Sequence, residues 1–130
     1  MIATHLDTSS QFTPKRETRV RAGLVEASLA LKVLKCRKKN VKRDLKLALF
    51  VADRAINYLA DSDAISTAML QMSWIFAEKD MPEDIKEVGI FVNSWVYEAL
   101  LIARSREKAL GRKLSRDVIS FDIPDAAEWN

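Results

Sequence analysis

Apolar residues recur every three or four positions along most of this chain, which is the period of an amphipathic α-helix. The pattern predicts a first helix over residues 14–39. Thr13 and Pro14 mark its start, because proline at the first helical position loses no hydrogen bond. The apolar stripe of this helix consists of Val20, Leu24, Ala27, Leu31 and Leu34.

Three further helices are predicted over residues 41–60, 63–78 and 82–111. Asp61, Ser62 and Asp63 interrupt the apolar pattern and supply an N-cap for the third helix, while Pro82 begins the fourth. The expected stripe of the second helix is Leu45, Leu49, Ala52, Ile56 and Leu59, and that of the third is Ile65, Ala68, Met69, Met72, Ile75 and Phe76. The expected stripe of the fourth is Ile85, Val88, Val92, Trp95, Val96, Ala99, Ala103 and Leu110.

The composition favours a helical fold, because 130 residues include only three Gly and three Pro while 48% are apolar. A chain of this length and apolar content can bury a sizeable core in one domain. We expect an all-α protein, a four-helix up-down bundle over residues 13–113. A flexible N-terminal arm (1–12) is expected before it and a short extended acidic C-terminal tail (114–130) after it.

The fourth helix has a second apolar stripe on nearly the opposite side from the first, formed by Ile90, Tyr97 and Leu101. In a four-helix bundle each helix needs only one buried stripe. The second stripe therefore predicts an oligomer interface, and we expect the chain to form a homo-oligomer through these three residues.

The charge pattern is dominated by a basic segment at the junction of the first two helices. Residues 32–46 include eight basic residues and a single acid, Asp44. Clustered Lys and Arg neutralise phosphate groups, so the segment predicts binding of a polyanion, RNA or DNA. In an up-down bundle it lies at the same end as the acidic turn between the third and fourth helices, which neutralises part of its charge. The expected contacts are Lys35, Arg37, Lys38, Lys39, Lys42 and Arg43.

A second basic group is formed by the start of the first helix and the end of the fourth, which meet at the other end of the bundle. Only Asp61 and Asp63 are expected to oppose it, and Arg binds phosphate in a bidentate manner that Lys cannot match. We therefore expect this group to contribute more to polyanion binding than the basic segment. Its residues are Arg16, Arg19, Arg104, Arg106, Arg112 and Lys113.

Residues suited to catalysis or metal binding are scarce. The only histidine, His5, lies in the expected N-terminal arm with Asp7 nearby, and two ligands do not make a closed metal site. The single Cys36 has no partner for a disulfide or a Cys-based metal site, which favours a cytoplasmic protein. No phosphate-binding loop, nucleophile motif or metal motif is found. We expect no enzymatic activity and no cofactor.

A membrane partner is not expected either. The most apolar stretch, residues 88–103, is 16 residues long, whereas a transmembrane helix needs about 20 apolar residues. The stretch is better interpreted as a buried helix.

The leading hypothesis is a non-enzymatic helical adaptor that contacts RNA or DNA and associates with itself. A basic surface also suits an acidic partner protein, so a protein-protein interaction module, such as an inhibitor or accessory subunit, is the alternative. The third hypothesis is an enzyme with an unrecognised carboxylate site, built from Asp61 and Asp63 or from Glu83, Asp84 and Glu87.

Overall fold

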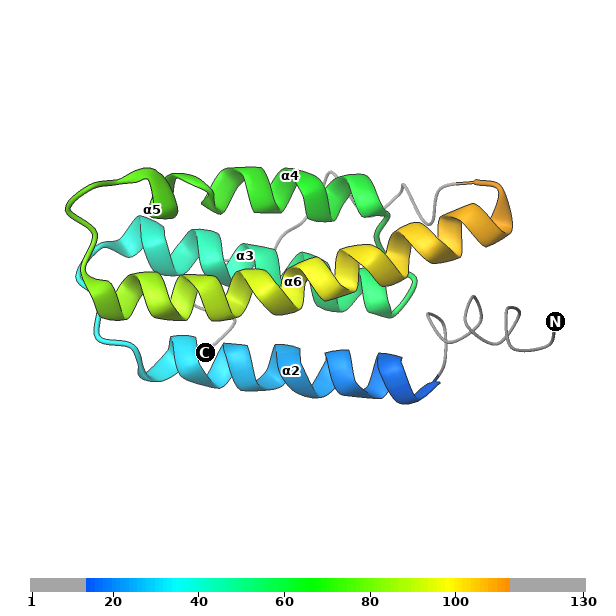
Figure 1. Cartoon of the computed structure of the whole chain (residues 1–130), viewed down its shortest axis with the longest axis horizontal. Coiled ribbons are helices and arrows are strands. Elements are labelled where there is room, and N and C mark those ends of the chain that lie inside the picture. Colours follow the sequence, from blue (N-terminus) through cyan, green and yellow to red (C-terminus); the bar gives the residue numbers. More distant parts are fainter. Residues whose placement is uncertain (1–13, 113–130) are drawn as a thin grey trace, which may run out of the picture.

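The computed structural model describes residues 14–112, which form four long helices and one single-turn helix (Figure 1). In chain order these are α2 (Pro14–Val33), α3 (Lys39–Ile56), α4 (Ser62–Met72), α5 (Trp74–Ala77) and α6 (Glu83–Leu110). Successive long helices run in opposite directions, so the predicted all-α, up-down bundle is confirmed. The predicted N-terminal arm and C-terminal tail lie outside the described residues.

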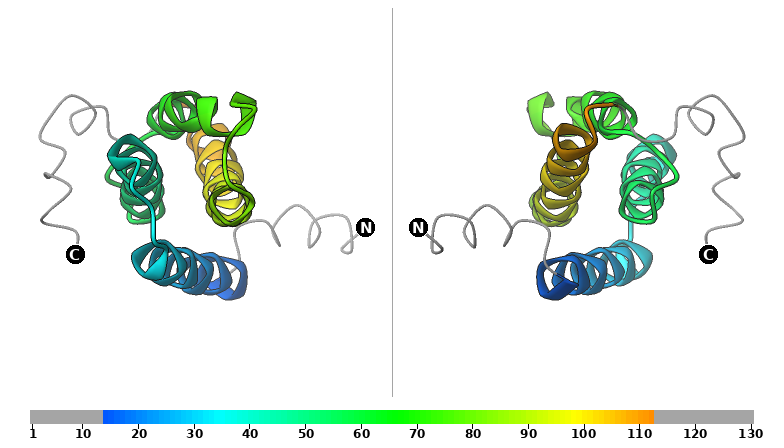
Figure 2. Two further views of the ribbon diagram at one scale, coloured as in Figure 1. Left: turned by 90° about the vertical axis from the view of Figure 1, so that its left-hand side faces the viewer. Right: turned by 90° about the vertical axis from the view of Figure 1, so that its right-hand side faces the viewer.

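The four long helices occupy the corners of a flattened diamond when the bundle is viewed along its axis, and α3 and α6 pack together across its short diagonal (Figure 2). Helix α2 packs against α3 and α6, and α4 packs against the same two helices from the opposite side. The α2–α3 and α5–α6 turns lie at one end, here called the α2–α3 end, and the α3–α4 connection lies at the other, the α3–α4 end. Helix α6 extends past its neighbours at the α3–α4 end.

The predicted apolar stripes form the core of the bundle. All five residues of the first stripe are buried, as are most of the others. Two predicted core positions are wrong, because Leu59 is 43% exposed and Leu110 is 52% exposed. Leu59 follows the end of α3 and Leu110 is the last residue of α6, so neither faces a neighbouring helix across the core.

Two predicted helices end earlier than expected. Helix α2 ends at Val33 rather than 39, since the Leu34 amide donates to the Leu31 carbonyl (3.2 Å) and Leu34 is buried beneath the turn. If the helix continued, basic side chains of the segment would lie three and four residues apart on one helical face, where like charges repel. Helix α3 ends at Ile56 rather than 60, because Tyr58 has a left-handed backbone (φ 61°) that no helix can include.

The third predicted helix is divided in two at Ser73. The Ser73 hydroxyl donates to the Leu70 carbonyl (2.7 Å), and α5 then forms a separate turn that contacts α4 and α6. This break places Trp74 so that its ring nitrogen reaches α3.

Close packing between α2 and α6 depends on a glycine. A Cβ atom at Gly23 would overlap the indole ring of Trp95. Glycine inside a helix is therefore required here by a neighbouring side chain.

Gly23→Ala should lower the free energy of unfolding in spite of the better helix propensity of alanine. Overpacking costs about 1–3 kcal/mol, and the rigid indole makes the upper part of that range the expectation, against a propensity gain of about 1 kcal/mol. Urea denaturation measures the difference, with the exposed Ser28→Ala as control. Equal or greater stability of Gly23→Ala would contradict the packing.

Candidate polyanion interface

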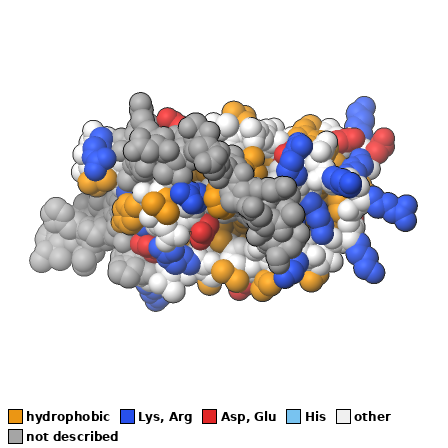
Figure 3. All heavy atoms as spheres, turned by 180° about the vertical axis from the view of Figure 1, so that it is seen from behind, with side chains coloured by type: hydrophobic (Ala, Val, Ile, Leu, Met, Phe, Trp, Pro, Cys, Tyr) orange, Lys and Arg blue, Asp and Glu red, His pale blue; other side chains and the backbone are white. Residues whose placement is uncertain are grey.

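The basic segment (residues 32–46) wraps around the α2–α3 end of the bundle. It includes the last turn of α2, the nonhelical residues 34–38 and the first turns of α3. Seen from behind, Lys and Arg side chains gather at this end of the molecule (Figure 3, right). Six of the eight cations are exposed and two are half-buried. The exposed ones are Lys32, Lys35, Arg37, Lys38, Lys39 and Arg43.

The acidic turn between α5 and α6 lies beside this segment, as the up-down arrangement predicts. Lys38 Nζ and Glu78 Oε1 are 3.5 Å apart, and their side chains are 44% and 42% exposed. An ion pair this exposed contributes about 0–1 kcal/mol and is readily exchanged for another anion.

The one acid of the segment, Asp44, is turned into the protein. Trp74 Nε1 donates to one of its oxygens (2.7 Å) and Arg43 Nε donates to the other (3.2 Å). The Asp44 residue is 7% exposed, so its charge is directed toward α5 and away from the surface. Arg43 stays 61% exposed while it makes this contact.

Five cations of the segment take no part in the ion pairs found among residues 14–112. They are Lys32, Lys35, Arg37, Lys39 and Lys42. Further along α3, burial and the positive charge of Lys42 lower the pKa of Lys46. The segment thus presents excess positive charge that the described part of the chain leaves uncompensated.

The basic group at the α3–α4 end differs from the basic segment because one of its arginines is buried. Arg106 is 5% exposed and its guanidinium donates to the carbonyls of Ala55 (3.1 Å) and Ile56 (2.9 Å) at the end of α3. It also forms an ion pair with Glu17 (2.9 Å) and lies 3.9 Å from the ring centre of Tyr58. The prediction that Arg106 belongs to an exposed binding surface is wrong, because its charge serves the fold.

Glu17 and Glu98 provide opposing charge that the sequence did not reveal at this end. Arg16 is 2.9 Å from Glu98, and Arg19 is 4.0 Å from the same carboxylate. The expectation that this group meets little opposing charge is therefore incorrect. Arg104 and Arg112 are exposed, whereas Lys113 lies outside the described residues.

The predicted oligomer residues of α6 are exposed to different degrees. Ile90 is 59% and Tyr97 45% exposed, while Leu101 is half-buried beside Arg16 and Arg104. A shallow groove between α4 and α6 runs beside Tyr97. Whether these residues form an interface remains a prediction.

Helix α2 has an exposed apolar row that the sequence reasoning missed. Val25 is 60% exposed, Leu29 57% and Val33 76%. The signal was present in the sequence, since the three residues repeat at a spacing of four beside the buried stripe. The buried stripe is the stronger apolar pattern of the same helix, so the weaker row beside it was not predicted.

Within residues 14–112, no group of three or more His, Cys, Asp or Glu side chains is placed to hold a metal ion. In the same part of the chain, no helix is both long and apolar enough to cross a membrane. Comparisons with known proteins find no matching family model, curated protein or solved structure. The basic segment is the strongest candidate site that the described residues offer.

Arg106→Met should destabilise the protein by about 3 kcal/mol, because it removes two buried hydrogen bonds to carbonyls of α3 and one of the two cations paired with Glu17. The matched variant Arg104→Met removes an exposed arginine of the same helix and should change the free energy of unfolding by less than about 0.5 kcal/mol. Urea denaturation of both proteins measures the difference. Similar stabilities would show that Arg106 is dispensable to the fold.

The same network predicts a dependence of stability on pH. Burial alone raises the pKa of Glu17, but the hydrogen bond from Arg21 and the charge of Arg106 outweigh it, so the folded pKa lies below the ordinary value of 4.5. A lowered folded pKa stabilises the protein above the unfolded pKa, and this stabilisation is lost as the pH falls through the folded pKa.

Glu17→Gln should therefore be less stable than the unmodified protein at pH 7, and the two stabilities should converge below about pH 4. Denaturant titrations at a series of pH values measure the convergence. A difference that stays constant down to pH 3 would contradict the assigned role of Glu17.

Proposed function

We propose that this chain is a non-catalytic helical binding subunit whose basic segment contacts RNA or DNA. The observation that supports the proposal is the contrast between the two basic ends. At the α3–α4 end Arg106 is buried and Arg16 is held by Glu98, although Arg104 stays exposed. In the basic segment, Lys35, Arg37 and Lys39 are all exposed and take part in no ion pair among residues 14–112. This contrast reverses the order of importance expected from the sequence.

The chemistry of the surface favours contact with the phosphate backbone. Exposed Lys and Arg side chains release counterions when they neutralise phosphates, and this supplies affinity without reading base sequence. The aromatic residues Trp74, Phe76 and Trp95 pack against the core and are not interleaved with the exposed cations. We therefore propose binding that depends steeply on salt and only weakly on nucleotide sequence.

An acidic protein partner is the alternative ligand for the same surface. The two ligands share negative charge, but a nucleic acid has a regular charge spacing that a folded acidic protein lacks. Competition between an oligonucleotide and poly-glutamate of matched charge distinguishes them.

Charge reversal provides the test. Lys35→Glu, Arg37→Glu and Lys39→Glu combined should weaken binding to a labelled oligonucleotide by at least about tenfold and reduce the salt slope by about 2–3, because each phosphate contact contributes about 0.9 to the slope. Fluorescence anisotropy between 50 and 200 mM salt measures both quantities.

The matched control reverses three exposed cations near the other end, Lys15, Arg104 and Lys108, and changes the net charge equally. This control should retain more of the affinity. Equal losses in the two triple variants would show that only net charge matters. Absence of salt-dependent binding by the unmodified protein would leave the acidic partner as the leading function.

We also propose that the chain associates with itself. Large apolar residues are exposed on α2, α4 and α6, and contiguous exposed apolar surface is typical of interfaces. The α6 residues Ile90, Tyr97 and Leu101 form one candidate face, and Leu101→Lys should weaken association if that face is used.

A further inference from the structure

The outward side of α2 is apolar over three helical turns. Val25, Leu29 and Val33 follow one another at a spacing of four and are each more than half exposed. The buried stripe of α2 lies on another side of the same helix and packs against α3 and α6. No described element covers the outward row, so α2 has one apolar face more than the bundle uses.

The row can pair with its own copy about its central residue. If a second α2 lies antiparallel to the first and crosses it at Leu29, Val33 of each copy comes level with Val25 of the other. At 100° per residue, the exposed Glu26 and Lys32 lie on opposite flanks of the row, and a two-fold axis brings like flanks of the two copies together. An apolar row that matches itself in this way is what a two-fold interface requires.

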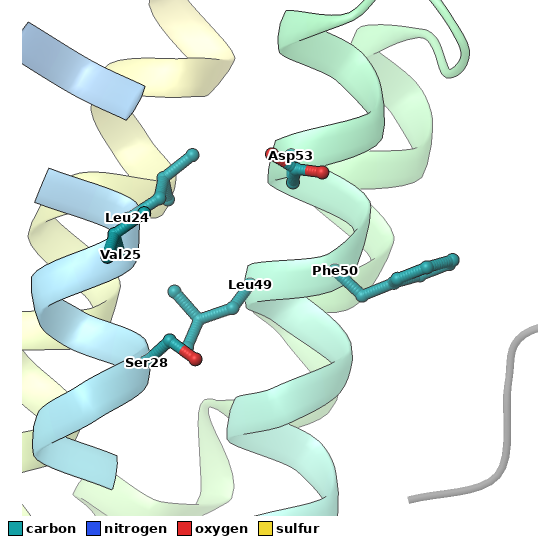
Figure 4. Close-up of a pocket in the computed structure, with 6 residues that line it drawn as sticks. All are labelled: Leu24, Val25, Ser28, Leu49, Phe50 and Asp53. Atoms are coloured by element: carbon teal, nitrogen blue, oxygen red, sulfur yellow. The ribbon is translucent and has the colours of Figure 1, made fainter. Parts of the chain in front are cut away.

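A groove beside the row adds to the complementarity. It lies between α2 and α3, and Val25 forms part of one wall while Asp53 of α3 contributes an exposed carboxylate (Figure 4). The antiparallel arrangement brings Lys32 of the second copy to the level of this groove. Lys32 lies on the same flank of the row as this groove, so that lysine then meets the carboxylate of Asp53.

Electrostatics also selects the direction of pairing. The basic segment follows directly after the row at the C-terminal end of α2. Parallel pairing would place the two basic segments side by side, where like charges repel. Antiparallel pairing places them at opposite ends of the dimer, so each stays accessible.

We infer that two copies of this chain form a dimer through the outward face of α2, packed antiparallel about Leu29. This inference rests on the self-association proposed above and assigns it to α2 instead of α6. Of the three α6 residues in the predicted stripe, Leu101 is half-buried, and the exposed Ile90 and Tyr97 are seven residues apart. The α2 row spans eight residues along the helix, about 12 Å, and so short a seam predicts a dissociation constant in the micromolar range.

Sedimentation velocity between 10 and 300 μM tests the face with a matched pair of variants. Leu29 and Ile90 are almost equally exposed, at 57% and 59%. Leu29→Lys should be monomeric throughout, and Ile90→Lys should dimerise like the unmodified protein, while circular dichroism confirms that both are folded. If Ile90→Lys is the monomeric variant, the α2 face is refuted and self-association stands. If the unmodified protein is monomeric at 300 μM, both proposals fail.

Cross-linking tests the antiparallel geometry without changing the surface charge. In a Cys36→Ser background, Leu29→Cys should cross-link to its own copy with a short bismaleimide. Val25→Cys mixed with Val33→Cys should give a heterologous product, and each alone should give little, because its own copies lie about 12 Å apart along the axis. Efficient cross-linking of Val25→Cys to itself would indicate parallel packing and overturn the inference.

A charge swap tests the predicted pairing of Lys32 with Asp53 of the other copy. Lys32→Asp alone should weaken the dimer by about three- to tenfold, and the double variant Asp53→Lys with Lys32→Asp should recover the affinity. Failure of the double variant to recover would contradict the register about Leu29.

Discussion

The bundle depends on a pair of adjacent charged residues, Arg106 and Glu107, that hold the connection between α3 and α4. Arg106 donates to the last carbonyls of α3, and Glu107 accepts from the backbone and the hydroxyl of Ser62 at the first turn of α4 (2.8 and 2.6 Å). A cation thus meets the negative end of one helix dipole and an anion meets the positive end of the next. Two neighbouring side chains of α6 thereby satisfy groups that the chain reversal leaves without helical partners.

This arrangement has consequences for the rest of the network. Tyr58 adopts its left-handed backbone in the connection and places its ring under the Arg106 guanidinium. Glu17 reaches the same guanidinium from α2 and is in turn bound by Arg21 (3.0 Å). One buried cation therefore connects α2, α3 and α6. Arg106, which looks available in the sequence, is thus committed to structure, whereas Arg104 of the same group stays exposed.

Much of the fold was predictable because the helical repeat of buried apolar residues is a pattern between positions close together in the sequence. Residue spacing predicts the stripe that begins at Val20, the start of α2 at Pro14 and the N-cap at Asp61. The Asp61 side chain accepts a hydrogen bond from the Ala64 amide (3.0 Å). The site was predictable only in part. The spacing of charged residues predicted the position of the basic segment and of its neighbour Glu78. Arg106 and Glu17, in contrast, are 89 positions apart in the sequence, so no local pattern predicts their ion pair.

The central claim is that the basic segment, and not the α3–α4 end, meets the polyanion. An NMR titration of the unmodified, ¹⁵N-labelled protein with a short oligonucleotide at low salt tests it residue by residue. The account predicts that the largest amide shift changes fall within residues 32–46, while the Arg106 side-chain signals stay unchanged. Largest changes at residues 14–21 and 104–112 would contradict the account, because cations there would then be binding the ligand while holding the fold.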